Sequence, residues 1–331
     1  MKTRTSISKR ALSKALFAVS VAAVMGGYLA PVMAQQKPIK IVVAFTAGGP
    51  VDFVARALAE QLSKEMGRPV IVENKPGANG AIGAVDVLKS EPDGTTLWIT
   101  SVGAVAINPA LYDKLPYDMQ RDFAPVSLVV NNVELLVVNQ KDPAISAAEF
   151  VAAVKKRKDP TPMASSGSGS IPHLAIEQLS DSTGASLLHI PYKGAAPAIT
   201  DLMGGTVNAF FGDVPGLIGH VKGGRLKAIG IASERRHPAL PDVKTLEEQG
   251  IKGVDTINWY ALFAPIKTPA ATIEALNKAV RAAVAAPAVF DKLQQSGADP
   301  MTSTPQELAN LLKRDTEKWA KMIKAKGIKP E

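Results

Sequence analysis

The stretch Phe45-Thr46-Ala47-Gly48-Gly49-Pro50-Val51-Asp52 indicates how this chain folds. It follows an apolar run, 39–44, that is typical of a strand covered on both faces. After it, Val54, Leu58 and Leu62 recur at the spacing of one helix face. The paired glycines permit a tight turn with room for a ligand beside the backbone, and proline suits the first helical position. Strand, glycine turn and helix N-terminus together predict a place where free backbone N–H groups hold an anion.

Residues 1–34 have the pattern of a secretory signal peptide. An apolar stretch, 15–30, ends close to small residues that fit cleavage near Ala34, and it is preceded by the bases Lys2, Arg4, Lys9, Arg10 and Lys14. The apolar stretch is short for a membrane anchor, and no other segment has the roughly 18 consecutive apolar residues that a span needs. We therefore expect the mature protein to be exported to the periplasm.

Charge and cysteine content narrow the function classes. Removing the five bases of the leader lowers the formal net charge from +8 to +3, so a nucleic-acid role loses its main support. The basic run 155–158 fits the end of a helix over 146–157, where cations are favourable. The chain has no cysteine, which excludes disulfides and thiolate chemistry. The remaining 297 residues (331 minus 34) are enough for two domains.

Strand-like and helix-like segments alternate along the chain. Beyond the first glycine turn, strands are expected at 70–72, 95–100, 127–130, 135–138, 187–190, 207–211 and 226–231. Helices are expected at 81–89, 106–112, 146–157, 171–182, 197–203, 215–222, 243–249, 268–285 and 304–326. This alternation predicts an α/β fold with largely parallel sheets.

Glycine- and serine-rich turns recur where a strand-like run meets a helix. They lie at 45–52, 101–104, 165–170, 191–197 and 212–215. One such turn is a weak signal, because ordinary turns between strands and helices are also rich in these residues. Open α/β sheets bind ligands at the carboxyl ends of their strands. Five turns of this kind in one chain therefore predict a shared binding cleft.

Other short motifs accompany these turns. They are Val72-Glu73-Asn74-Lys75-Pro76-Gly77-Ala78, Pro92-Asp93-Gly94-Thr95-Thr96-Leu97, Asn108-Pro109-Ala110-Leu111-Tyr112, Asp122-Phe123-Ala124-Pro125-Val126, Pro191-Tyr192-Lys193-Gly194, Asp201-Leu202-Met203-Gly204-Gly205 and the run 238–243. With the 48–52 turn, they make the chain similar to the substrate-binding proteins of tripartite tricarboxylate transporters, often called Bug receptors. The resemblance covers residues 38–328, although Thr46 stands where proline is frequent in that family.

The resemblance implies a type 2 periplasmic binding-protein fold, in which two α/β domains are joined by two crossover segments with a ligand cleft between them. We expect domain 1 at 38–136 plus 258–331 and domain 2 at 137–257. It also implies a receptor that delivers a small organic carboxylate to one large and one small membrane subunit of a secondary transporter. A ligand-sensing module that signals to a membrane sensor kinase is the alternative use of the same fold.

In this family, the turns of the first domain hold a ligand carboxylate, partly through ordered water, and the second domain contributes more to ligand discrimination. Carrying this over to the matching turns gives a set of expected ligand-binding residues. They are Phe45, Thr46, Gly48, Gly49, Asp52, Ser101, Gly103, Ala104, Ser166, Gly167, Ser168, His173, Lys193, Gly194 and Asp213.

The serine turn leaves two interpretations open. Ser166, Ser168 and Ser170 offer hydroxyl groups that donate to a ligand or cap the following helix. We expect at least one of them to do both, because a helix N-terminus with hydroxyl groups suits an anion. His173, one turn into that helix, either contacts the ligand or packs against backbone.

The charged candidates are also ambiguous. Lys193 either offers its charge to a second carboxylate or points to solvent. Asp213 either faces the cleft, where it repels a second carboxylate and favours an amine or hydroxyl group, or caps the helix that begins near Pro215. The helix position of Asp52 favours a capping role.

No spacing supports an enzyme. The chain lacks a Gly-x-Ser-x-Gly nucleophile elbow, a Walker loop and a His-Glu-x-x-His metal motif. Ser166 and His173 could in principle form a dyad in a cleft, but no spacing around them indicates an activated nucleophile. We expect a monomeric receptor without cofactor, metal or nucleic acid, whose ligand is an aliphatic dicarboxylate, an aromatic carboxylate or an acidic amino acid.

Overall fold

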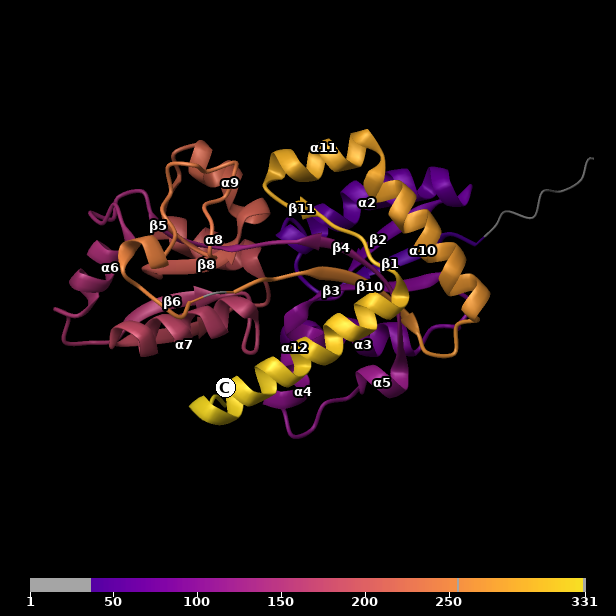
Figure 1. The fold of residues 1–331 in the computed structure, drawn as a ribbon, viewed down its shortest axis with the longest axis horizontal. Coiled ribbons are helices and arrows are strands. Elements are labelled where there is room, and N and C mark those ends of the chain that lie inside the picture. The colour runs from indigo at the N-terminus through magenta and orange to yellow at the C-terminus, as the bar shows by residue number, and fades with distance from the viewer. Residues whose placement is uncertain (1–36, 255, 330–331) are drawn as a thin grey trace, which may run out of the picture. The chain divides into compact units, whose positions relative to one another are not determined.

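A computed structural model describes residues 37–254 and 256–329. The expected signal peptide, 1–34, therefore lies outside the described residues. The strands form one six-stranded and one five-stranded sheet, each flanked by helices (Figure 1). In the described ranges, none of the helices combines the length and apolar character needed to span a membrane.

The six-stranded sheet has the strand order β11-β4-β10-β3-β1-β2. β1 pairs in parallel with β2 and β3, whereas β10 is antiparallel to β3 and β4. The first strand is buried except at Lys40, which is partly buried, and the prediction of a strand covered on both faces is confirmed. The strands are β1 (Ile39–Val43), β2 (Val70–Asn74), β3 (Thr96–Ser101), β4 (Phe123–Asn131), β10 (Tyr260–Pro265) and β11 (Asp299–Pro300).

The five-stranded sheet has the order β7-β6-β8-β5-β9. Its alternating side chains feed two separate apolar clusters, because successive residues of a strand point to opposite faces. Leu136 and Val138 belong to the cluster with α6 and α7, and Leu135 and Val137 belong to the cluster with α8 and α9. The strands are β5 (Glu134–Asn139), β6 (Thr161–Ser165), β7 (Leu187–Pro191), β8 (Ala209–Asp213) and β9 (Leu226–Ala232).

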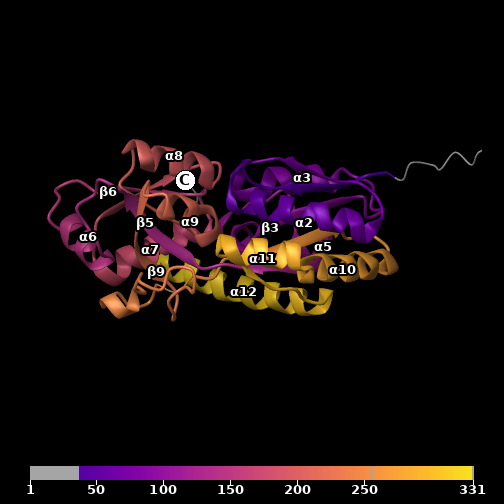
Figure 2. The same cartoon turned by 90° about the horizontal axis from the view of Figure 1, so that it is seen from above.

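Helices cover both faces of each sheet. In Figure 1, α2, α10 and α11 lie on one side of the six-stranded sheet, and α3, α4 and α12 lie on the other. Figure 2 shows α8 and α9 over the five-stranded sheet from above. The helices are α2 (Pro50–Met66), α3 (Ala81–Leu88), α4 (Asn108–Leu111), α5 (Met119–Asp122), α6 (Ala147–Val154), α7 (Ile171–Thr183), α8 (Ala195–Gly204), α9 (Val214–Lys222), α10 (Ala270–Ala285), α11 (Pro287–Ser296) and α12 (Pro305–Lys326). Shorter helical turns are η1 (Ala78–Gly80), η2 (Gly103–Ile107) and η3 (Glu247–Gln249).

Two helix predictions need correction. The helix expected over 243–249 is wrong apart from the single turn η3, because this segment pairs with β9 instead. The Ile231 N–H donates to the Lys244 carbonyl, and the Leu246 N–H donates to the Ile231 carbonyl. The sequence analysis also missed α11, which begins at Pro287 after an extended Ala286. A residue before proline avoids the helical conformation, so the preceding helix ends and a new one begins at once.

Two chain segments connect the sheets, and they are hydrogen-bonded to each other. The first lies between Asn131 and Glu134, and the second leads into β10. The Asn132 N–H donates to the Asn258 carbonyl at 3.2 Å, and the Asn258 N–H donates back at 2.9 Å. The expected boundary between 136 and 137 would divide β5, which belongs wholly to the five-stranded sheet. We therefore propose that the division between the domains falls at 132–133.

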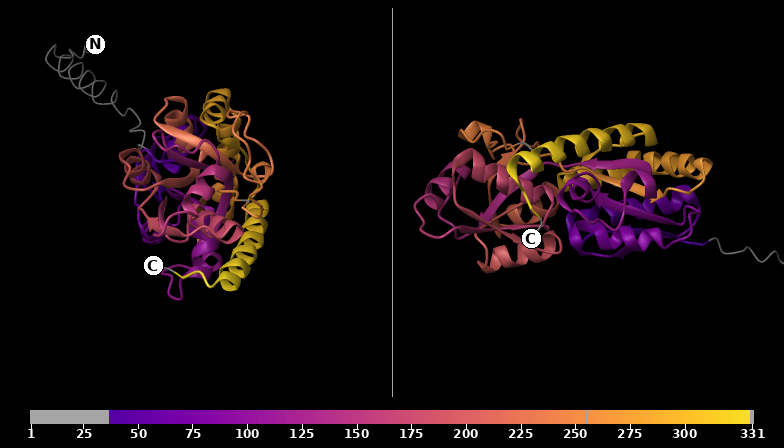
Figure 3. Two further views of the ribbon diagram at one scale, coloured as in Figure 1. Left: turned by 90° about the vertical axis from the view of Figure 1, so that its left-hand side faces the viewer. Right: turned by 90° about the horizontal axis from the view of Figure 1, so that it is seen from below.

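The C-terminal helix contacts both sheet layers. α12 packs on β4 and η2 of the six-stranded layer. Its last turns reach α7, where Gln178 Nε2 donates to Met322 Sδ and Lys326 forms an ion pair with Asp181. The right-hand view in Figure 3 shows this helix, in yellow, running along one side of the molecule. The segment 258–331, which we expect in domain 1, thus contains a helix that also contacts the five-stranded layer.

Candidate functional site

A small cavity lies where the turns after β1, β3, β6 and β8 come together. Its volume is about 20 Å³, which is room for roughly one water molecule. Both sheet layers contribute to it. The cavity is lined by Phe45, Gly49, Pro50, Val51, Ser101, Ser166, Pro172, Ala195, Phe210, Gly212, Asp213, Asn258 and Tyr260.

Among the helices that begin at this cavity, α2 and α8 have no side-chain cap. Their N-cap residues are Gly49 and Gly194, and neither makes a side-chain capping hydrogen bond. The first N–H groups of a helix have no partner within the helix. Val51 of α2 and Ala195 of α8, both in the first turn of their helix, line the cavity. The site therefore offers backbone donors and the positive ends of two helix dipoles.

Asp52 holds the glycine turn from behind the cavity. Its carboxylate accepts hydrogen bonds from the Gly48 N–H at 2.9 Å, from Arg56 Nε at 2.9 Å and from Asn74 Nδ2 at 2.9 Å. Burial alone would raise the pKa of Asp52, but the hydrogen bonds from Arg56, Gly48 and Asn74 outweigh it, and the pKa is lowered. Gly48 has φ +77°, a conformation that glycine adopts without strain. Asp52 thus fixes the turn and does not line the cavity.

The serine turn divides its two expected roles between different residues. Ser170 caps α7, because its hydroxyl accepts from the His173 N–H at 3.3 Å. Ser166 lines the cavity. In the structure, the serine that caps α7 is therefore not the one that lines the cavity, and whether either binds a ligand stays a prediction. The sequence cannot separate these roles, because three serines alternate with glycines in one short turn.

His173 supports the turn instead of lining the cavity. Its Nδ1 accepts from the Gly169 N–H at 3.1 Å, and its ring stacks on His189 at a centroid distance of 3.8 Å. His189 Nε2 lies 2.6 Å from the Ser165 hydroxyl oxygen, which accepts from the Gly167 N–H. Burial lowers the pKa of His189 to about 4. The two imidazoles therefore fix the shape of the turn, and the packed interpretation of His173 is the one that the structure favours.

Asp213 is buried at the cavity among hydrogen-bond donors. It occupies the N-cap position of α9, but its side chain makes no capping hydrogen bond. Its Oδ2 accepts from the Tyr260 hydroxyl and, at 3.1 Å, from Asn258 Nδ2. Asp213 and Tyr260 both line the cavity. Of the two interpretations of Asp213, the cleft-facing one agrees with this geometry and the capping one does not.

A second buried acid, Glu134, lies next to Asp213. Glu134 is opposite Asp213 in the antiparallel pairing of β5 and β8, and Asn258 Nδ2 also donates to its Oε1 at 3.2 Å. Burial, followed by the charge of Asp213, raises the pKa of Glu134 well above its usual range. Burial also raises the pKa of Asp213 to about 7, although the hydrogen bonds of Tyr260, Glu134 and Asn258 counteract part of the rise. The pair therefore keeps one proton between its two carboxyl groups near neutral pH.

Glu134, Asn258 and Tyr260 were not predicted as site residues. One signal was present, because Glu134 is an acid directly before four apolar residues of a strand, and a charged side chain is rarely fully buried without a partner. Asn258 and Tyr260 had no comparable signal. They reach the site only because the second connecting segment lies beside the first.

Five of the expected ligand-binding residues line the cavity. They are Phe45, Gly49, Ser101, Ser166 and Asp213. Asp52 and His173 support turns, and the Lys193 side chain is exposed. The other expected residues lie in or beside the same turns without lining the cavity: Thr46, Gly48, Gly103, Ala104, Gly167, Ser168 and Gly194.

Several of these glycines let the turns of the two sheets approach closely. A Cβ on Gly194 would lie 2.6 Å from the Thr46 hydroxyl oxygen, and one on Gly103 would lie 3.0 Å from the Gly169 carbonyl. Both distances are too short for a side chain without movement of the neighbour. These glycines therefore act by bringing main chain together around the cavity.

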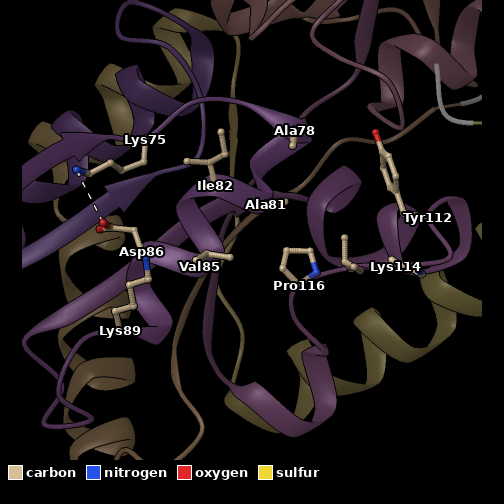
Figure 4. A pocket seen from close by; sticks show the side chains of 11 residues that line it. Lys75, Ala78, Ala81, Ile82, Val85, Asp86, Lys89, Tyr112, Lys114 and Pro116 are labelled. Carbon is tan, nitrogen blue, oxygen red and sulfur yellow. Dashed lines mark ion pairs between the residues drawn. The ribbon is translucent and has the colours of Figure 1, made fainter.

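A larger cavity of about 390 Å³ lies elsewhere, against α3 (Figure 4). Its lining combines apolar side chains such as Ile82 and Leu115 with Lys75, Asp86 and Lys89. Figure 4 shows the ion pair between Lys75 and Asp86, whose charged atoms lie 3.8 Å apart. This cavity contains no expected ligand-binding residue, and the polar groups described above do not converge on it.

Comparisons with known proteins agree with this architecture. The family model of the tripartite tricarboxylate transporter family receptor matches residues 54–328. The chain is 34% identical to Protein BugT of Bordetella pertussis over 322 residues, which are 96% of this chain and 99% of that protein. The solved periplasmic binding protein BugD is 34% identical, with a TM-score of 0.85 over 89% of this chain and 99% of its own. An R. palustris protein solved with adipate is 30% identical, with a TM-score of 0.86 over 90% of this chain and 100% of its own.

These findings confirm the resemblance drawn from the motifs and the type 2 periplasmic binding-protein fold that it implied. Two α/β domains joined by two connecting segments, with the cavity between them, are the arrangement described above. The chain belongs to the tripartite tricarboxylate transporter receptor family, the Bug family of periplasmic solute-binding proteins.

Proposed function

We propose that this protein captures a small organic carboxylate in the cavity at the first turn of α2 and delivers it to a tripartite tricarboxylate-type secondary transporter. The supporting observation is that two uncapped helix N-termini, those of α2 and α8, meet at one cavity between the domains. A carboxylate placed there receives backbone N–H hydrogen bonds and two favourable dipoles. The adipate reported with the R. palustris relative supports the same ligand class.

The cavity suits an anion even though its lining contains no basic side chain among the described residues. Charge-assisted hydrogen bonds from neutral donors to a carboxylate are about twice as strong as hydrogen bonds between neutral groups. Ser101 and Ser166 add hydroxyl donors to the backbone groups of Val51 and Ala195. The ligand carboxylate would therefore be recognised by neutral donors, without an ion pair to Lys193.

The other expected residues have supporting roles in this proposal. Asp52 holds the Gly48 N–H in place, and His173 holds the Gly169 N–H. Thr46 and Gly194 form one contact between the domains, and Gly103 forms another. We further propose that the receptor is a monomer, that it is exported by residues 1–34, and that it hands its ligand to one large and one small membrane subunit.

A binding screen tests the ligand class. Purified protein is heated with succinate, glutarate, adipate, benzoate, L-aspartate and L-glutamate, each at millimolar concentration. A ligand present at 100 times its Kd adds about 2.7 kcal/mol to the free energy of unfolding, and Tm should rise by about 5–10 °C. Titration calorimetry then measures Kd for each ligand that shifts Tm. No shift of Tm with any of these carboxylates would contradict the proposal.

A transport assay tests the delivery step separately. The two membrane subunits are reconstituted in vesicles, and uptake of the radiolabelled ligand is measured with and without the receptor. We expect uptake to require both the receptor and an ion gradient, without ATP. Uptake that is unchanged when the receptor is omitted would contradict delivery, and it would leave the binding result intact.

A further inference from the structure

The cavity holds an acid that a receptor for simple carboxylates does not need. Asp213 is the single charged side chain in the lining formed by the described residues, and its residue is 5% exposed. Its Oδ2 accepts hydrogen bonds from the Tyr260 hydroxyl and from Asn258 Nδ2, and its carboxyl group also shares a hydrogen bond with that of Glu134. All of these partners are uncharged donors, and a charged donor makes a stronger hydrogen bond to a carboxylate than a neutral one. A cationic group of a ligand in the cavity would therefore interact favourably with this acid.

Glu134 sets the charge of this acid. It is 0% exposed, and its carboxyl group is hydrogen-bonded to that of Asp213. Two carboxyl groups held this close share a proton, because two adjacent buried negative charges repel strongly. The pair thus carries a single negative charge, and Glu134 acts through Asp213 because it does not line the cavity.

This negative charge shares a small cavity with the two helix N-termini that attract a carboxylate. A ligand with carboxylates alone would place one of them near the Asp213 charge, where it would be repelled. A ligand that also carries an ammonium group would give Asp213 a charge-assisted donor and would leave its carboxylate to the backbone N–H groups. Opposite charges in one cavity therefore match a ligand that is itself a zwitterion.

We propose that the ligand is a small carboxylate that also carries a protonated amine, and that Asp213, with Glu134 as its positioning partner, is the residue that selects the amine. The proposal rests on the proposed function, because it needs a carboxylate at the helix N-termini. It narrows the ligand class to amino acids and related ammonium carboxylates. A hydroxyl group in place of the amine satisfies one acceptor but does not neutralise the charge.

Matched ligands on one carbon skeleton test this choice. Titration calorimetry at pH 8.0 compares succinate, L-malate and L-aspartate, then glutarate, 2-hydroxyglutarate and L-glutamate, then butanoate, 2-hydroxybutanoate and 2-aminobutanoate. In the series that contains the tightest ligand, we expect the amino compound to bind at least about tenfold more tightly than the desamino and hydroxy compounds of the same carbon skeleton. Equal or weaker binding of the amine would overturn the proposal. It would leave the proposed function standing, because carboxylates would still bind.

Variants test whether Asp213 is the residue that selects the amine. Asp213→Asn keeps the shape of the side chain and removes the charge, so the amine preference should fall to about threefold or less, while binding of the desamino ligand is retained or improved. Asp291→Asn removes the same charge from an exposed position on α11 and serves as the matched control. A preference that survives in folded Asp213→Asn would overturn the role of Asp213. Glu134→Gln should keep the preference for the amine at pH 8.0 but change how this preference depends on pH. Loss of the amine preference at pH 8.0 in this variant would overturn the positioning role of Glu134.

The wild-type protein provides a test that does not depend on folding of a variant. The groups that face Asp213 are Glu134 from β5, Asn258 before β10 and Tyr260 within it. Since burial raises the pKa of Asp213 to about 7, the pair becomes neutral at pH 5.0, while the ligand keeps both of its charges. The amine preference should shrink at least about threefold between pH 8.0 and pH 5.0. A constant preference would contradict the proposal, and no binding of any carboxylate would overturn the proposed function as well.

Discussion

Glu134 and Asp213 stand directly opposite each other in strands β5 and β8, and the side-chain amide of Asn258 donates to both. The pair lies beside the two segments that connect the sheets, since Glu134 begins the strand after the first segment and Asn258 belongs to the second. A buried acid pair at this place links the protonation of the protein to its stability as well as to its ligand.

The first prediction concerns this linkage. The pKa values of Asp213 and Glu134 are raised in the folded state, so between about pH 4 and pH 7 the folded protein binds more protons than the unfolded chain. The contribution of the pair to the free energy of unfolding therefore falls as pH rises through this window. Glu134→Gln removes the part of that dependence that Glu134 contributes, and its Tm relative to wild type should be at least about 3 °C higher at pH 7.5 than at pH 4.5.

Differential scanning calorimetry across pH 4.5–7.5 provides the measurement. Asp291→Asn is the matched control, because it removes a carboxylate from an exposed position on α11. Parallel curves of Tm against pH for wild type and Glu134→Gln would show that the pair does not take up a proton in this range.

The second prediction separates two serines of one turn. Ser170→Ala removes the cap of α7 and should lower the free energy of unfolding by about 1 kcal/mol, with little change in ligand affinity. Ser166→Ala removes a hydroxyl from the cavity lining and should weaken carboxylate binding about tenfold, with little change in stability. Chemical denaturation and titration calorimetry on both variants check this. The reverse assignment, with Ser170→Ala weaker in binding and Ser166→Ala less stable, would refute it.

Local sequence patterns were sufficient to predict most helices and strands. The segment that was predicted wrongly and the site residues that were missed depend on contacts between residues far apart in the chain. The alternation of apolar runs and helical faces was sufficient for β1 and α2, because burial and period determine both. The segment 243–249 was predicted wrongly because its pairing with Ile231 is a contact between distant parts of the chain. The glycine turns indicated the site, but Asn258 and Tyr260 enter it through the packing of the connecting segments, which no local pattern encodes.

The third prediction concerns motion. The cavity volume of about 20 Å³ is far below that of a dicarboxylate, so a ligand can reach the helix N-termini only if the domains move apart. The segments around Asn132 and Asn258 are the only covalent connections that such a motion must bend among the described residues. Hinged receptors are open without ligand and close on it, so we expect the free protein in solution to be more open than this structure. Small-angle scattering should then give a smaller radius of gyration with the carboxylate of largest thermal shift than without it. An identical radius at saturation would contradict a hinge.

The central claim is that main chain at the glycine turn, and not a basic side chain, holds the carboxylate. Gly49 has φ −81° and ψ 171°, which any residue can adopt, but a Cβ there would lie 3.2 Å from the Thr46 carbonyl oxygen and beside the cavity. Gly49→Val should therefore fold and should weaken carboxylate binding by at least about 100-fold, equivalent to about 2.7 kcal/mol. Lys193→Ala, which truncates an exposed side chain, should change affinity less than about threefold.

Titration calorimetry on these two variants, with circular dichroism to show that both are folded, tests this claim most directly. The account predicts that folded Gly49→Val loses nearly all affinity for the carboxylate while Lys193→Ala binds like wild type. Folded Gly49→Val that binds like wild type, together with Lys193→Ala that no longer binds, would contradict it and would make the lysine the anchor.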